Sequence, residues 1–129
     1  MDNFKVMVVD DEVDFLETII KRLKARKIEV TGAENGQRAL EVLAEQDIDV
    51  IVLDVKMPGM DGIETLRAIK ERKPLTEVIM LTGHASVESG IQGMQLGAFD
   101  YVMKPVALDE LLEKMRQAYE RKLIQEGKV

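Results

Sequence analysis

The segment Val50–Gly62 constrains the fold more than any other part of this sequence. Four consecutive apolar residues, Val50 to Leu53, run directly into Asp54, and a Pro-Gly turn follows. An apolar run without alternation is typical of a strand buried on both faces, as in a parallel sheet covered by helices. Asp54 is then expected at the carboxyl end of that strand, the edge where ligands collect in open α/β sheets. If it stood alone, Asp54 would be interpreted as a turn cap.

The length and composition are those of one soluble globular domain. The chain has 129 residues, of which 46% are hydrophobic and 33% charged, enough for one core and too few for two ordinary domains. It has no apolar run near the roughly 20 residues of a membrane span, and its start lacks the pattern of a signal peptide. Together with the absence of cysteine, this favours a cytoplasmic location. The formal charge of −6 argues against broad nucleic-acid binding.

Apolar patterns predict five strands alternating with five helices. The expected strands are residues 5–9, 28–31, 50–54, 78–81 and 99–103. A stretch with helical spacing follows each of them; the inward positions outside the fourth helix are Leu16, Ile19, Ile20, Leu23, Ala39, Leu40, Leu43, Ile63, Leu66, Ile69, Leu108, Leu111, Leu112 and Met115. This alternation with short connections indicates a doubly wound parallel sheet. The polar tail, roughly Gln125 to Val129, is expected to fray.

Several residues mark where these helices begin and end. Asn35 is expected to cap the second helix, and Asp61 with Glu64 forms the pattern of a capping box for the third. Ser86 is a candidate cap for the fourth helix, and Gly97 is its expected stop.

The fourth helix, about residues 86–96, is predicted to be the weakest. Its inward apolar positions are expected to be Val87, Ile91 and Met94. It also contains Gly90 and Gly93, each of which costs about 1 kcal/mol relative to alanine in a helix interior.

Polar residues follow four of the five predicted strands at the same edge of the sheet. Asp10 and Asp11 follow the first strand, Asp54 ends the third, and Thr82 and Lys104 follow the fourth and fifth. Crowded carboxylates repel one another unless a cation lies among them, and hard oxygen ligands are those that Mg²⁺ prefers. The lysine and the hydroxyl would suit an anionic group beside such an ion.

These residues stand in blocks that resemble the receiver (CheY-like) domain of two-component response regulators. The blocks are Asp10-Asp11, residues 53–62, residues 81–84 and residues 100–105. The match extends in order from about Lys5 to the last helix. It implies a flavodoxin-like, three-layer fold with strand order 2-1-3-4-5, and one receiver domain over residues 1–129, in which residues 125–129 are a tail or the start of a linker.

The resemblance also implies a role for each site residue. Asp54 would accept a phosphoryl group from a histidine kinase, a phosphotransfer protein or a small phosphodonor. Lys104 would hold the phosphoryl oxygens, the Thr82 hydroxyl would turn toward them after transfer, and Tyr101 would be the aromatic switch. Mg²⁺, with Mn²⁺ as a substitute, would be held directly by Asp11, Asp54 and the main-chain carbonyl of Lys56, and by Asp10 mainly through water.

The chemistry of phosphoryl transfer agrees with these roles. Such a transfer needs mostly positioning and neutralisation of charge, and Asp54 is expected to be ionised at neutral pH without a general base. The domain would be a switch, catalysing only its own phosphorylation and slow dephosphorylation. Its output would leave through the fourth helix, fifth strand and fifth helix, toward an effector, an output domain or a second copy. The blocks look most like receivers of enhancer-binding transcription activators.

Other interpretations are weighed against this one. A phosphorylation-independent interaction scaffold would not need the full set of site residues. A flavodoxin-like carrier needs a hydroxyl- and glycine-rich loop after the first strand, and a haloacid-dehalogenase-type phosphatase needs an Asp-x-Asp motif where position 56 is lysine. Lys104 would ordinarily be an exposed loop lysine, and Tyr101 could be a core tyrosine. His84, the one histidine, is interpreted as a residue at the rim of the site.

Overall fold

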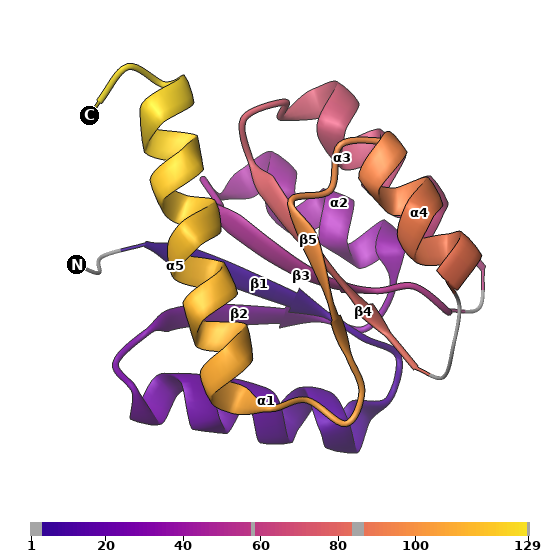
Figure 1. Ribbon diagram of the computed structural model, residues 1–129. Coiled ribbons are helices and arrows are strands. Elements are labelled where there is room, and N and C mark those ends of the chain that lie inside the picture. The colour runs from indigo at the N-terminus through magenta and orange to yellow at the C-terminus, as the bar shows by residue number, and fades with distance from the viewer. Residues whose placement is uncertain (1–3, 58, 84–86, 129) are drawn as a thin grey trace.

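The computed structural model describes residues 4–57, 59–83 and 87–128, the side chains of residues 87–90 excepted. Five strands alternate with five helices along the chain (Figure 1). The strands are β1 Lys5–Val9, β2 Glu29–Ala33, β3 Val50–Asp54, β4 Glu77–Thr82 and β5 Asp100–Met103. The helices are α1 Val13–Ala25, α2 Gly36–Glu45, α3 Gly62–Arg72, α4 Val87–Gln95 and α5 Leu108–Gln125.

The strands form one parallel sheet in the order β2-β1-β3-β4-β5. Helices α1 and α5 cover one face of this sheet, and α2, α3 and α4 cover the other (Figure 1). The predicted fold class, layers and strand order are therefore confirmed. Among the described residues, no helix is long and apolar enough to cross a membrane.

Both faces of the sheet are buried, which explains the unbroken apolar runs in the sequence. In β1, Val6 and Val8 pack toward α1 and α5, whereas Met7 and Val9 pack toward the opposite helices. All five residues of β3, including Asp54, are buried. Since β3 lies at the centre of the sheet, its carboxyl end is flanked by neighbouring strands on both sides.

The predicted helix ends in the described part of the chain are confirmed. The Asn35 side chain accepts a hydrogen bond from the main-chain N–H of Arg38 at 2.8 Å, and Asp61 and Glu64 form the capping box at the start of α3. Gly97 follows α4 with a φ of +103°, a conformation that favours glycine. The proposed cap Ser86 lies outside the described residues.

The predicted inner face of α4 is wrong. Ile91 and Met94 are 54% and 44% exposed, whereas Gly93 is buried. A Cβ atom at Gly93 would lie 3.3 Å from Met80 Cγ on β4, so α4 approaches the sheet through its glycine. The spacing of apolar residues did not predict this face, because the contact is made by a glycine, which has no side chain to mark it. Ile91 and Met94 are left exposed as a result. The side chain of the third predicted position, Val87, lies outside the described residues.

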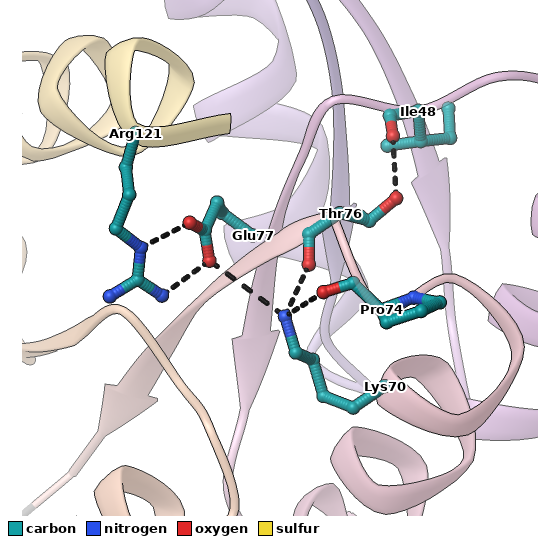
Figure 2. A network of polar contacts seen from close by, with 6 residues as sticks. All are labelled: Ile48, Lys70, Pro74, Thr76, Glu77 and Arg121. Carbon is teal, nitrogen blue, oxygen red and sulfur yellow. Dashed lines mark hydrogen bonds and ion pairs between the residues drawn. The ribbon is translucent and has the colours of Figure 1, made fainter. Parts of the chain in front are cut away.

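The amino-terminal edge of the sheet is held by a buried carboxylate (Figure 2). Glu77, at the start of β4, is fully buried, and the guanidinium of Arg121 from α5 donates two hydrogen bonds to its two oxygens. Lys70 of α3 lies 3.8 Å from the same carboxylate and donates to the carbonyls of Pro74 and Thr76. One strand is thus tied to a helix on each face of the sheet. We call Glu77, Arg121 and Lys70 the Glu77 clamp.

Candidate functional site

Residues at the ends of four strands meet around one cavity at the carboxyl edge of the sheet. Asp10 follows β1, Asp54 ends β3, Thr82 ends β4 and Lys104 follows β5. The cavity has a volume of about 370 Å³ and is lined by Asp11, Glu12, Asp54, Val55, Lys56, Thr82, Gly83 and Lys104. The structure therefore brings the predicted residues of this edge together, whereas the predicted switch residue Tyr101 does not line the cavity. His84 lies outside the described residues.

Asp54 lines this cavity and is 5% exposed. The main-chain N–H of Lys56 donates a hydrogen bond to Asp54 Oδ1 at 3.4 Å. The start of α3 packs closely against the end of β3. This is possible because α3 begins at Gly62, where a Cβ atom would stand 2.3 Å from the Asp54 carbonyl oxygen. Sequence reasoning gave Gly62 no role of its own. A glycine at the first helical position after a buried strand is the signal of such a close approach.

Burial raises the pKa of the Asp54 carboxyl group to about 7, and the negative charge of Asp10 adds to this effect. The nearby Lys104 ammonium and the hydrogen bond from Lys56 act in the opposite direction but are outweighed. Without a bound cation, the predicted ionisation of Asp54 at neutral pH is therefore opposed by its surroundings. The sequence showed which charges gather at this edge but not how thoroughly water is excluded from it.

Three carboxylates at this edge offer oxygen atoms within 4.8 Å of one another, those of Asp10, Glu12 and Asp54. Asp10 is fully buried, and within the described part of the chain the only cation that reaches its Oδ2 atom is Lys104, at 2.8 Å. Such a group of hard oxygen donors fits a small divalent cation. Glu12 was not among the predicted ligands. Asp11, which was, lines the same cavity and contributes to the raised pKa of Asp54.

The Lys104 ammonium group faces several carboxylates at once. Its Nζ atom lies 2.8 Å from both Asp10 Oδ2 and Glu12 Oε1, and 3.9 Å from Asp54 Oδ2. Burial alone would lower the pKa of Lys104, but pairing with Asp10 and Glu12 outweighs it and the pKa is raised. The side chain is only 16% exposed. The interpretation of Lys104 as an ordinary exposed loop lysine is therefore wrong.

Thr82 and Tyr101 differ in their surroundings. The Thr82 side chain is 2% exposed, and its hydroxyl donates a hydrogen bond to the sulfur of Met103 at 3.2 Å. Tyr101 is 43% exposed, with the Lys114 ammonium 5.7 Å from the centre of its ring. The alternative of a core tyrosine is therefore wrong.

Two regulatory proteins of Escherichia coli are similar to this chain in sequence. The DNA-binding transcriptional regulator NtrC of Escherichia coli strain K12 is 38% identical over 113 residues, which are 88% of this chain and 24% of NtrC. The regulatory protein AtoC of the same organism is 37% identical over 107 residues, 83% of this chain and 23% of AtoC. The chain thus spans about a quarter of the length of these relatives.

Solved structures show the same architecture over almost the whole chain. The crystal structure of a response regulator receiver domain protein from Clostridium thermocellum superposes with a TM-score of 0.90 at 36% identity, covering 95% of this chain and 98% of that one. The family model of the response regulator receiver domain matches residues 6–116. That range contains every residue that lines the cavity at the carboxyl edge. By fold, site and sequence, the chain belongs to the receiver domain family of two-component response regulators.

Proposed function

We propose that this chain is a phosphorylation-controlled switch in which Asp54 accepts a phosphoryl group. An Asp54 carboxylate oxygen would bond to phosphorus. The bond from phosphorus to the donor's nitrogen or oxygen would break, and the donor would keep that electron pair. The observation that carries the proposal is the buried Asp54 in the lining of the cavity, with Lys104 Nζ 3.9 Å from its Oδ2 atom. The chain would catalyse only its own phosphorylation and slow dephosphorylation.

Neutralisation of charge is the main requirement of this chemistry. The transferred group spreads negative charge over three oxygens, and the cavity already holds several carboxylates. Mg²⁺, or Mn²⁺ in its place, would supply positive charge when bound. Asp10, Asp11, Asp54 and the carbonyl of Lys56 are the proposed ligands. The close approach of the Asp10 and Asp54 oxygens supports two members of that set.

The input would come from a histidine kinase, a phosphotransfer protein or a small phosphodonor in the cytoplasm. The output would leave through the surface of α4, β5 and α5, toward an effector, an attached output domain or a second copy of the chain. Exposed apolar side chains support this choice, since Ile91, Met94, Tyr101 and Met103 are each more than two-fifths exposed there. The resemblance to NtrC suggests that the regulated process is transcription. DNA contact would then belong to another part of such a protein.

Intact-mass analysis tests the proposal directly. Incubation with acetyl phosphate and Mg²⁺ should add one phosphoryl group to the wild-type chain and none to Asp54→Ala. Chelation of the metal or Asp11→Ala should stop the reaction, because the charge on the incoming group would be uncompensated. Asp47→Ala, at an exposed position away from the cavity, is the matched control and should be labelled like wild type. Full labelling of Asp54→Ala would place the acceptor elsewhere, and no labelling of wild type by any donor would favour the interaction scaffold.

A further inference from the structure

The Lys104 ammonium group is held on the side of the cavity formed by the start of α1. Its Nζ atom donates a hydrogen bond to Glu12 Oε1 at 2.8 Å and lies 2.8 Å from Asp10 Oδ2 in an ion pair. The ammonium also lies 4.6 Å from the centre of the Phe15 ring, a cation–π contact. Its distance to Asp54 Oδ2, 3.9 Å, is beyond hydrogen-bonding range. We call this arrangement the resting position of Lys104.

Among the residues that the structure describes, Lys104 is the only one that makes a hydrogen bond or ion pair with the Glu12 side chain. Glu12 is the N-cap residue of α1, but its side chain makes no capping hydrogen bond. Glutamate is also not among the residues preferred at that position. The side chain is 65% exposed, and its Oε1 atom accepts a hydrogen bond from Lys104 rather than from its own helix. The pairing with Lys104 lowers the pKa of Glu12, so the contact joins two charged groups.

We propose that Glu12 is a positioning residue that holds Lys104 in its resting position and competes with the phosphoryl group for the ammonium. This rests on the proposed function, because it assigns a partner to Lys104 before Asp54 is phosphorylated. An anionic group on Asp54 would attract the same ammonium group, which in the resting position donates to Glu12 and lies 3.9 Å from Asp54 Oδ2. The ammonium must therefore leave Glu12, or share its charge with it, when phosphoryl arrives. The negative charge of Glu12 makes the resting state more favourable and phosphorylation less so.

The inference predicts that Glu12→Gln makes the active state easier to reach. Glutamine keeps the length of the side chain but removes its charge. The affinity for beryllofluoride, a mimic of the aspartyl phosphoryl group, should rise about two- to fivefold, the range expected for loss of one exposed ion pair. The kcat/KM for phosphorylation by acetyl phosphate should rise to a similar extent. Both are measured at saturating Mg²⁺ and fixed ionic strength, and Mg²⁺ affinity is measured separately without a phosphodonor.

A matched variant separates this contact from a general change in charge. Asp14→Asn removes one negative charge from the first turn of the same helix, at an exposed residue whose carboxylate pairs with none of the described cations. It should leave beryllofluoride affinity close to wild type. A nuclear magnetic resonance signal from the Lys104 side chain gives a direct readout. In Glu12→Gln without beryllofluoride it should shift part of the way toward its position in the beryllofluoride complex, and in Asp14→Asn it should not.

Three results would overturn the inference. Equal gains in Glu12→Gln and Asp14→Asn would show a non-specific effect of charge. Unchanged or weaker beryllofluoride binding by Glu12→Gln would show that Glu12 does not compete for Lys104. A loss of Mg²⁺ affinity in Glu12→Gln that exceeds the loss in Asp14→Asn would identify Glu12 as a metal ligand instead. Failure of the wild-type protein to bind beryllofluoride or accept phosphoryl would overturn the proposed function itself. The three results above compare variants with a wild-type protein that does bind, so the two kinds of failure are distinguishable.

Discussion

At the scale of single residues, the proposed acceptor Asp54 carries an energetic cost to the fold. Its folded-state pKa of about 7 lies above the ordinary value of 3.8, so folding favours the protonated form. The contribution of Asp54 to stability is therefore greatest below about pH 4 and is lost as the pH rises through 7. At pH 8 the buried group is charged among other carboxylates. A bound cation would lower its pKa again and reduce this cost.

We predict that Asp54→Asn is more stable than wild type at pH 8 in the presence of a chelator. Asparagine stays neutral at every pH, so the gain should be about 1–3 kcal/mol smaller at pH 5, where folded wild type is protonated at Asp54. Urea unfolding of both proteins at the two pH values measures the difference. The exposed control Asp47→Asn should show no such change with pH. A gain that is equal at pH 5 and pH 8 would show that Asp54 does not titrate in this range.

At the scale of elements, the Glu77 clamp (Figure 2) links β4 to α3 and α5 at the edge opposite the site. Arg121 also stacks its guanidinium 4.9 Å from the centre of the Phe99 ring, just before β5. Burial lowers the pKa of Lys70, although the charge of Glu77 opposes the change. A fully buried carboxylate is tolerated only while its cationic partners remain, because an uncompensated charge in the interior is costly.

Removing one partner should therefore destabilise the fold. We predict that Arg121→Met lowers the free energy of unfolding by about 1–3 kcal/mol, less than for a fully buried pair because Arg121 is 41% exposed and Lys70 remains. Arg116→Met is the matched control on the same helix. Its partners Glu113 and Glu120 are exposed, so the loss should stay within about 0.5 kcal/mol. Equal effects of the two variants in urea unfolding would mean that the buried position of Glu77 is unimportant.

Sequence patterns were sufficient to predict most of the strands and helix ends, but not the orientation of every helix. Continuous apolar runs identified the strands because both faces of the sheet are covered, and short-range caps such as Asn35 were readable because donor and acceptor are close in sequence. The orientation of α4 was not readable, because Gly93 contributes no side chain to the pattern. The β2 strand is Glu29–Ala33 rather than residues 28–31. Its extension through Gly32 is favoured by pairing with Val8 of β1.

At the scale of the whole molecule, topology explains why the site could be predicted as a set. Parallel strands place their carboxyl ends at one edge, so Asp10, Asp54 and Lys104 meet although they are far apart in sequence. The sequence does not show which ion-pair partner each charged side chain has. The Glu12–Lys104 pair joins residues 92 positions apart. It depends on side-chain reach across the cavity, which no local pattern records.

The same topology suggests how a change at the site would reach a distant surface. The buried Thr82 hydroxyl is bonded to Met103, whose side chain is 46% exposed at the end of β5. If the hydroxyl turned toward a phosphoryl group on Asp54, it would give up the Met103 sulfur. The strand that carries Met103 also carries Tyr101, whose carbonyl accepts a hydrogen bond from Lys114 of α5. A contiguous set of contacts therefore connects the site to β5 and α5.

We predict that beryllofluoride with Mg²⁺ changes amide hydrogen exchange mainly in α4, β5 and the start of α5. Helix α4 should respond most, because its two glycines cost it about 2 kcal/mol relative to alanine and low local stability favours fast opening. Thr82→Val keeps the shape of the side chain but lacks the hydroxyl. It should retain the changes next to Asp54 and lose most of those in β5, because its apolar side chain can neither bond to Met103 nor turn toward the phosphoryl mimic. Changes confined to α1 and α2, with residues 91–104 unaffected, would contradict this route, as would an unaltered response in Thr82→Val.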